Sequence, residues 1–195
     1  SLGIIGGGVY PYMFYDLGLA ESLPRYFSAL GYATTAVHPE NPANWRRDVV
    51  YGRMGFDRFL SEDDFADDAD TLRGMVTDRE TYDLILDLLE GDDAPQFVFD
   101  VTLQNHGGYE TGLLDSYPHD GVTVRGERIE GMSEYLSCAD ASEEDLLYFL
   151  ERLEGLDRKV VVVFFGDHQP GFNDALAEAS YGSAVGDLGI AEGQS

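Results

Sequence analysis

Three short apolar runs, each followed by a histidine-bearing loop, most constrain how this 195-residue chain can fold. Uninterrupted runs of this length are typical of parallel strands buried on both faces of a sheet. The runs are residues 33–37, 95–103 and 159–165, and the histidines in the loops after them are His38, His106 and His168. We therefore predict three strands whose carboxyl ends carry polar loops.

Helical patterns separate these runs, with apolar residues repeating every three or four positions over 19–30, 81–90 and 142–153. Gly31 stands at the position of a helix C-cap, and Ser142 is the expected N-cap of the third helix. Strands alternating with helices predict an α/β fold with a mostly parallel sheet flanked by helices on both faces. In such a fold the site lies at the carboxyl ends of the strands.

The rest of the chain offers fewer signals. Residues 1–15 are rich in glycine and aromatic side chains and predict a loop, whereas the tail from residue 175 loses its periodicity. A hydrophobic content of 44% over this length suits one core, so residues 1–195 are expected to form a single domain.

Charge and hydropathy exclude several classes of protein. The formal charge of -25 argues against nucleic-acid binding, which needs a basic face. No run approaches the roughly 20 apolar residues of a membrane helix, and no leader pattern is present, so the chain as given is expected to be soluble.

Acidic residues gather between positions 62 and 70, where they form either a solvated loop or a segment that attracts divalent cations. Cys138 is alone and cannot form an intrachain disulfide.

The loops after the strands hold the candidate chemistry. Asp167 and His168 offer a carboxylate and an imidazole suited to Mn²⁺ or Zn²⁺, although a loop-capping Asp beside a surface His is the alternative. His106 is placed to bond a phosphoryl oxygen or move a proton, or else is structural. Arg47 can fork onto a phosphate while Trp45 walls a polyol pocket; a buried Trp near a surface ion pair is the alternative.

Read in order, the polar segments resemble the lipoteichoic acid synthase group of the sulfatase and alkaline phosphatase superfamily. The resemblance spans roughly residues 8–170. It is carried by HPENPANWRRD (38–48), Tyr51, GFD (55–57), TLQNHG (102–107) and FFGDHQP (164–170).

This resemblance implies a metal-dependent enzyme that transfers phosphoglycerol from phosphatidylglycerol to a glycan or teichoic acid-type acceptor through a covalent threonine intermediate. It implies Mn²⁺ or Mg²⁺ as cofactor, and a membrane-anchored parent protein at the extracytoplasmic face of the bacterial membrane. Carried onto this chain, Asp167 and His168 match the metal-ligand pair, and His106 matches the substrate-pocket histidine. Trp45 and Arg47 match the phosphoglycerol-binding loop, with His38 at its start.

Two departures from the family pattern follow. Glu40 stands near where some relatives have Asp, which keeps a carboxylate with a longer reach. In the family, the nucleophilic threonine and another acidic ligand precede a segment resembling residues 1–15. The chain is therefore expected to be an internal fragment that lacks its nucleophile and its final strands, binds metal weakly and is inactive alone.

Two other functions stay open. Within the superfamily, the runner-up is a sulfatase or a phosphoethanolamine transferase. From another class, the chain could be a non-catalytic module that binds anionic headgroups. The sequence before Ser1 would discriminate between enzyme and module, since a glycine-flanked threonine there favours the enzyme.

Overall fold

The computed structural model describes residues 12, 18, 20–114, 117–168 and 170–182. The chain divides into two compact units. The first unit comprises Ser1–Thr71 and Met75–Leu103, and the second comprises Leu72–Gly74 and Gln104–Ser195. The expectation that residues 1–195 form one catalytic domain stays a prediction.

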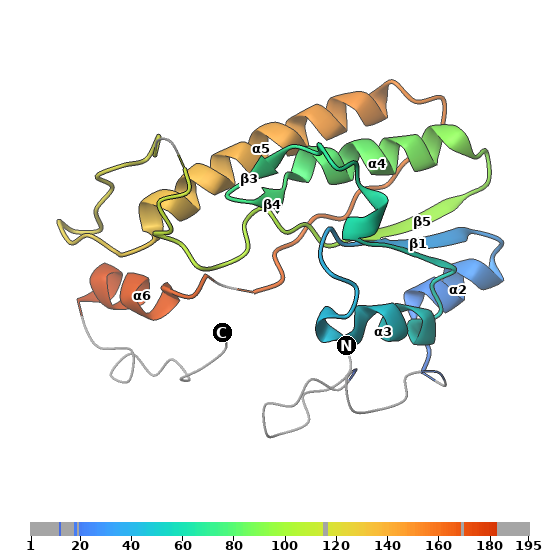
Figure 1. The fold of residues 1–195 in the computed structure, drawn as a ribbon, viewed down its shortest axis with the longest axis horizontal. Helices are drawn as coiled ribbons and strands as arrows, with labels where there is room; N and C mark the ends of the chain where they lie inside the picture. The colour runs from blue at the N-terminus through green and yellow to red at the C-terminus, as the bar shows by residue number, and fades with distance from the viewer. Residues whose placement is uncertain (1–11, 13–17, 19, 115–116, 169, 183–195) are drawn as a thin grey trace. The chain divides into compact units, whose positions relative to one another are not determined.

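A three-stranded parallel sheet forms the centre of the first unit (Figure 1). In spatial order its strands are β2 (Arg58–Leu60), β1 (Ala33–Val37) and β5 (Gln96–Asp100). The strands predicted at 33–37 and 95–103 are thus confirmed, the second over a shorter span, whereas β2 was not predicted. In the register, Val37 lies opposite both Leu60 and Asp100, so the carboxyl ends of the three strands are level.

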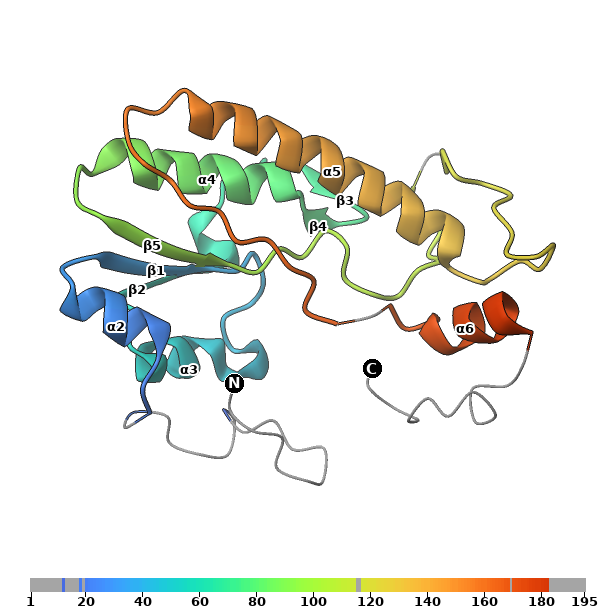
Figure 2. The ribbon, with the colours of Figure 1, turned by 180° about the vertical axis from the view of Figure 1, so that it is seen from behind.

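Helices cover both faces of this sheet. Figures 1 and 2 show α2 (Leu23–Ala29) and α3 (Arg47–Met54) on one face and α4 (Asp78–Gly91) on the other. The α/β class with a parallel sheet and flanking helices is therefore confirmed. The helix predicted at 81–90 is confirmed as α4, and the one predicted at 19–30 is present over the shorter span of α2.

Aromatic side chains fill the space between the sheet and α2 and α3. Phe27 of α2 stacks on Phe97 of β5, with ring centroids 4.6 Å apart. The buried residues Ala36, Tyr51 and Phe56 form a cluster, against which Met54, Phe59, Phe97 and Phe99 pack. Burying a side chain of this size stabilises a fold by roughly 1.5 to 3 kcal/mol, so this cluster fixes where α3 lies.

Local signals place the helix ends. The Ser22 hydroxyl accepts a hydrogen bond from the Arg25 amide at the start of α2, and the Thr77 hydroxyl accepts one from Glu80 at the start of α4. Gly55 caps the C-terminal end of α3, and its φ of 97° favours glycine. A Cβ at this position would lie 2.5 Å from Cγ of Arg25, so a larger residue would also clash.

The second unit contains α5 (Met132–Glu154) and α6 (Asn173–Tyr181). The helix predicted at 142–153 is present but begins ten residues earlier, so Ser142 lies inside α5 and the expectation that it is an N-cap is wrong. Its hydroxyl instead accepts hydrogen bonds from the side chains of Gln104 and Asn105. The expectation of an irregular tail from residue 175 is also wrong as far as Tyr181, since α6 occupies that stretch. Residues 183–195, like most of the loop predicted at 1–15, lie outside the described residues.

The strand predicted at 159–165 does not form. This run has no regular secondary structure, and its apolar side chains are exposed, with Val161 at 89% and Val163 at 77%. A strand exists only when a neighbour pairs with its backbone groups, and none of the described strands pairs with this run. Local β propensity is therefore present, but the partner that would make it a strand is not among the described elements.

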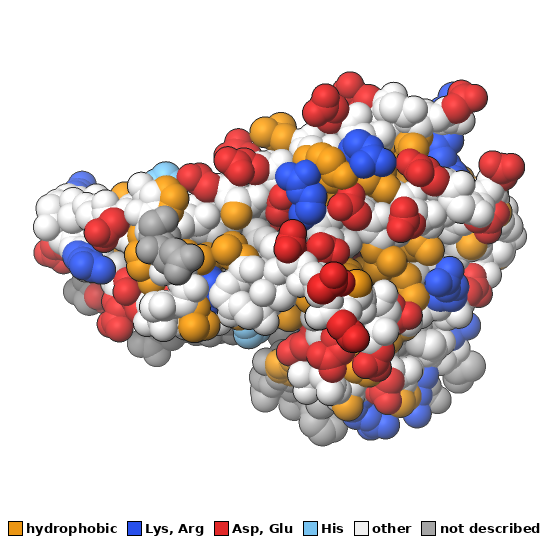
Figure 3. Space-filling view, turned by 45° about the horizontal axis from the view of Figure 1, so that its top comes forward, with side chains coloured by type: hydrophobic (Ala, Val, Ile, Leu, Met, Phe, Trp, Pro, Cys, Tyr) orange, Lys and Arg blue, Asp and Glu red, His pale blue; other side chains and the backbone are white. Residues whose placement is uncertain are grey.

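Short elements complete the chain: η2 (Asn44–Arg46), η3 (Glu62–Asp64), and the hairpin of β3 (Thr71–Leu72) with β4 (Met75–Val76). The acidic residues near η3 are exposed, which agrees with the interpretation of a solvated loop. Asp and Glu side chains are prominent on the face drawn in Figure 3. Within the described part of the chain, no helix combines the length and apolar character that spanning a membrane requires.

Asp100 places a carboxyl group inside the first unit at the end of β5. Both of its carboxylate oxygens are enclosed, and neither accepts a hydrogen bond of good geometry from a described residue. The pKa of Asp100 is raised to about 7, mainly by burial and also by the nearby Asp78, against the opposing influence of the Thr81 hydroxyl and the Val101 amide. The folded chain therefore holds a proton that the unfolded chain releases at lower pH.

This carboxyl group makes stability depend on pH. Because the folded pKa lies above the ordinary value of 3.8, stability falls as pH rises between those two values, and the cost is complete above about pH 7. Asp100→Asn should stabilise the chain by a few kcal/mol at pH 8 and change it little near pH 4, as measured by urea unfolding. The matched control is Asp63→Asn, an exposed carboxylate that should show no such difference. Equal effects of Asp100→Asn at both pH values would contradict the assignment.

Candidate functional site

His38 ties together the carboxyl ends of the strands in the first unit. Its backbone amide donates to the carbonyl of Leu60, the last residue of β2, and its Nδ1 lies 2.6 Å from the carbonyl of Val101, the first residue after β5. The side chain is 2% exposed. The first residue beyond β1 is thus held by both neighbouring strands, which gives the loop that follows a rigid base.

Glu40 is the centre of a polar cluster in that loop. Its Oε2 lies 2.5 Å from a terminal nitrogen of Arg47 and 3.1 Å from Nε2 of His38, and its Oε1 accepts a 3.0 Å hydrogen bond from the side-chain amide of Asn44. Burial alone would raise the pKa of Glu40, but hydrogen bonds from His38, Arg47 and Asn44 hold it below its ordinary value. Glu40 is therefore charged at neutral pH, and it orients the arginine.

A strained turn presents Trp45 and Arg47. Trp45 and Arg46 both adopt left-handed backbone angles, with φ of 55° and 53°, which residues other than glycine rarely adopt. Such strain costs on the order of 1 to 3 kcal/mol per residue and is typical of functional loops. Trp45 is 41% exposed, so the alternative of a buried tryptophan is wrong. Arg47 begins α3 and is 18% exposed.

The structure therefore brings four predicted site residues together in one loop of the first unit: His38, Glu40, Trp45 and Arg47. Sequence reasoning missed two further members, Asn44 and Tyr51. Asn44 bonds Glu40, and the buried Tyr51 hydroxyl interacts with Arg47. The available signal was their place in the sequence: Asn44 directly precedes the predicted Trp45, and Tyr51 follows the predicted Arg47 by four residues.

His106 lies in an anchored loop of the second unit. The side chains of Gln104 and Asn105 donate to Ser142 on α5, and the Tyr109 hydroxyl donates to the Asn105 carbonyl at 2.6 Å. Burial raises the pKa of Tyr109 to about 12, which keeps this hydroxyl a donor. His106 itself is exposed, so an imidazole projects from a backbone that is held on several sides.

Asp167 and His168 follow the exposed run in the second unit. His168 Nε2 lies 3.5 Å from an Asp167 oxygen, and both side chains are largely exposed, at 59% and 71%. A carboxylate and an imidazole are donors that Mn²⁺ and Zn²⁺ accept, so the pair fits the expected metal in kind. In the part of the chain that the structure describes, no group of three or more His, Cys, Asp or Glu side chains could hold a metal ion.

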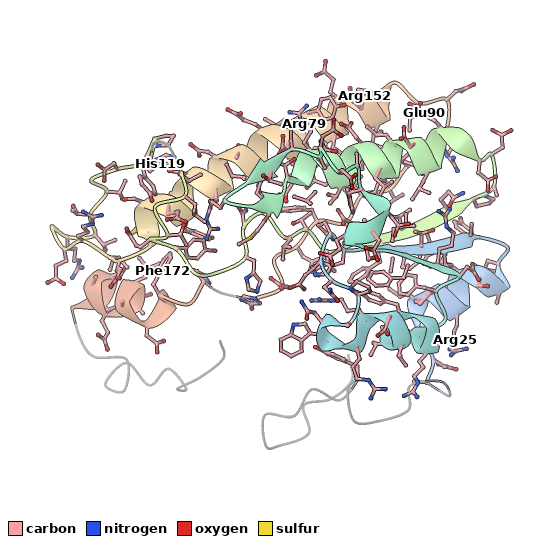
Figure 4. All side chains as sticks on the ribbon, in the orientation of Figure 1. Arg25, Arg79, Glu90, His119, Arg152 and Phe172 are labelled. Atoms are coloured by element: carbon pink, nitrogen blue, oxygen red, sulfur yellow. The ribbon has the colours of Figure 1, made fainter. Side chains whose placement is uncertain are left out.

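An aromatic cluster links the two loops of the second unit. Tyr109, from the His106 loop, lies 6.0 Å from Phe172, which follows His168 by four residues, and both rings contact Tyr135 on α5. Figure 4 labels Phe172 at the start of α6. The loops carrying His106 and Asp167 are thus anchored to the same helix. The expectation that these residues share one cleft with Trp45 and Arg47, which belong to the other unit, stays a prediction.

The environment of His38 leads to a titration test. Burial is the main influence that lowers the pKa of His38, the Arg47 charge lowers it further, and Glu40 raises it. Replacing Glu40 by Gln should therefore move the His38 pKa still lower, as followed by NMR of the imidazole carbon-bound protons. Glu62→Gln, a change at an exposed carboxylate near the loop, is the control and should leave it unchanged. An upward shift in Glu40→Gln would contradict the cluster described here.

Comparisons with known proteins identify the family of the chain. A Rhizobium meliloti protein named for cyclic beta-1,2-glucan modification is 32% identical over 89% of this chain and 27% of its own length. A lipoteichoic acid synthase-like protein of Bacillus subtilis is 27% identical over 75% of this chain and 24% of its own length. The chain therefore spans about a quarter of each of these relatives.

A solved structure of a Streptococcus pyogenes phosphoglycerol transferase in complex with sn-glycerol-1-phosphate superposes with a TM-score of 0.70. It is 23% identical and covers 89% of this chain and 45% of its own, so it supports the fold. The family model for sulfatase matches residues 11–190. The chain therefore belongs to the sulfatase family.

Proposed function

We propose that the protein transfers phosphoglycerol from phosphatidylglycerol to a hydroxyl of a glycan or teichoic acid-type acceptor. Relatives named for lipoteichoic acid synthesis and for glucan modification, together with the phosphoglycerol transferase fold, support this class of reaction. The observation that carries the proposal is the cluster in which Glu40 orients the Arg47 guanidinium at the carboxyl ends of parallel strands.

Arg47 has the chemistry to bind the transferred phosphate. A guanidinium has five N–H donors in a planar fork that matches phosphate oxygens, and the Glu40 contact through one terminal nitrogen sets its orientation. Holding the side chain before substrate arrives reduces the entropy lost on binding. Trp45, exposed on the strained turn beside it, is suited to wall the glycerol moiety.

His106 would act on the phosphoryl group from the second unit. An exposed imidazole on an anchored backbone can donate a hydrogen bond to a phosphoryl oxygen or protonate the departing diacylglycerol oxygen. Both roles depend on a fixed position, because reacting groups must meet within about 3 to 3.5 Å.

Asp167 and His168 would hold the metal, proposed to be Mn²⁺ or Mg²⁺. Enzymes of this superfamily generally depend on a metal. When bound, the ion would neutralise phosphoryl charge and lower the pKa of the nucleophilic hydroxyl. Two side chains supply fewer donors than such ions take, so we propose that another acidic ligand and the nucleophilic threonine come from sequence preceding residue 1. We also propose that the complete protein is anchored in the membrane and acts at its extracytoplasmic face.

The Arg47 assignment can be tested in the complete protein with phosphatidylglycerol as donor. Arg47→Ala should lower turnover about ten- to a hundredfold, since a lost charge-assisted contact costs roughly 1.5 to 3 kcal/mol. Arg46→Ala removes the adjacent exposed arginine and is the matched control, expected to stay close to wild type. An unaltered rate in Arg47→Ala would show that this side chain does not contact the donor.

Donor choice separates the proposal from the other sulfatase-family activities. The same assay with phosphatidylethanolamine and with an aryl sulfate should give no turnover if the Trp45 and Arg47 loop binds phosphoglycerol. Preference for either of these compounds would replace the proposed reaction with phosphoethanolamine transfer or sulfate ester hydrolysis. Headgroup binding without turnover of any donor would indicate a non-catalytic module.

The 195-residue chain by itself is expected to bind Mn²⁺ weakly and to transfer no phosphoglycerol. Asp167 and His168 offer only two ligands to the ion. A hard cation needs more protein ligands than two before it gives up its bound waters, so binding should be weak. Calorimetry with Mn²⁺ and a transfer assay, run beside a longer version that includes the preceding sequence, would measure both. Robust transfer or submicromolar binding by the short chain would mean that the nucleophile lies within these residues.

A further inference from the structure

Arg73 lies at the turn of the small β3–β4 hairpin and belongs to the second unit. It follows β3 and precedes β4, and both Arg73 and Gly74 have positive φ, at 56° and 78°. Positive φ at both central residues is the requirement of the tight turn that joins two antiparallel strands. An arginine at an exposed turn would normally extend into solvent, but the Arg73 side chain is 0% exposed.

The buried guanidinium holds the backbone on both sides of Gly107. One terminal nitrogen of Arg73 donates to the His106 carbonyl at 3.2 Å, and the other donates to the Gly108 carbonyl at 3.0 Å. Its Cζ also lies 5.1 Å from the centre of the Tyr109 ring. Since Gly107 and Gly108 have no side chains to pack, this segment would otherwise sample many conformations.

Glu134 balances the charge of Arg73. Its side chain is also 0% exposed, and its Oε1 lies 2.5 Å from Nε of Arg73. It accepts hydrogen bonds from the amide and hydroxyl of Thr111 and from the Tyr117 hydroxyl. Burial alone would raise the pKa of Glu134, but the Thr111 and Tyr117 bonds and the Arg73 charge hold it below its ordinary value, so the pair is ionic at neutral pH.

We propose that Arg73, paired with Glu134, is a positioning residue that holds the His106 loop in its reactive conformation. The inference rests on the proposed function for the role of His106 in phosphoryl transfer. Arg73 touches no reacting group in this scheme. It acts by restraining the carbonyls of His106 and Gly108, which leaves the imidazole exposed while its backbone is fixed.

Arg73→Lys in the complete protein is the informative variant. Lysine keeps the charge opposite Glu134, so folding should be retained, but a single ammonium cannot reproduce the planar fork that reaches two carbonyls. We expect faster amide hydrogen exchange in residues 105–111, and a kcat lowered about ten- to a hundredfold with KM for the donor changed much less. Arg73→Met, which leaves Glu134 buried without its partner, should lose stability as well.

The matched control is Asp140→Asn on the same helix. Asp140 pairs with His119 at 2.5 Å and so ties a different loop to α5. His119 is labelled in Figure 4. This variant should leave both the exchange of residues 105–111 and kcat unchanged. Circular dichroism and the thermal midpoint of each variant report the folded fraction, by which kcat is corrected.

Two results would overturn the inference. One is wild-type exchange and kcat in Arg73→Lys. The other is exchange that rises equally throughout the second unit, with a fall in kcat that the folded fraction fully explains, since that would make the ion pair a general stabiliser. If the wild-type protein transfers no phosphoglycerol but Arg73→Lys still loosens residues 105–111 alone, the proposed function fails while the restraint of the loop by Arg73 stands.

Discussion

The parallel pairing of β1 with β2 and β5 is the constraint on which the site in the first unit depends. Because the three strands end level, the first residue after β1 can bond carbonyls at the ends of both neighbours, and His38 does so. That double attachment leaves the next residues little freedom. Glu40 can then orient Arg47, and the cost of the left-handed turn at Trp45 is met by the surrounding structure.

Two arginines in this chain are each held by a glutamate, and their exposure separates their roles. Arg47 is 18% exposed beside a partly exposed Glu40, which leaves it accessible to a ligand from solvent. The side chains of Arg73 and Glu134 are both enclosed, and the terminal nitrogens of Arg73 donate to the protein's own backbone. The same kind of ion pair would thus serve the proposed substrate binding in one unit and the proposed loop restraint in the other.

Sequence reasoning succeeded where structure follows from local pattern. The strand at 33–37 and the helix at 81–90 carry continuous apolar or amphipathic runs, and both were found with nearly correct bounds. It failed where structure depends on distant partners: residues 159–165 look like a strand but pair with no described strand. Arg73 was missed for the same reason, since nothing near it in sequence indicates Glu134 or the His106 carbonyl. Residues 38–47 were recognised as a motif from the sequence, but the hydrogen bonds among them could not be predicted from it.

The exposed run at residues 159–165 also affects how the isolated chain behaves in solution. It contains four consecutive valines and two phenylalanines, with no charge after Lys159 and no proline. Such a segment, whose backbone pairs with none of the described strands, can form a cross-β stack with the same segment of other molecules. The seven residues that point to a strand by their composition therefore mark where copies of this chain would begin to aggregate at high concentration.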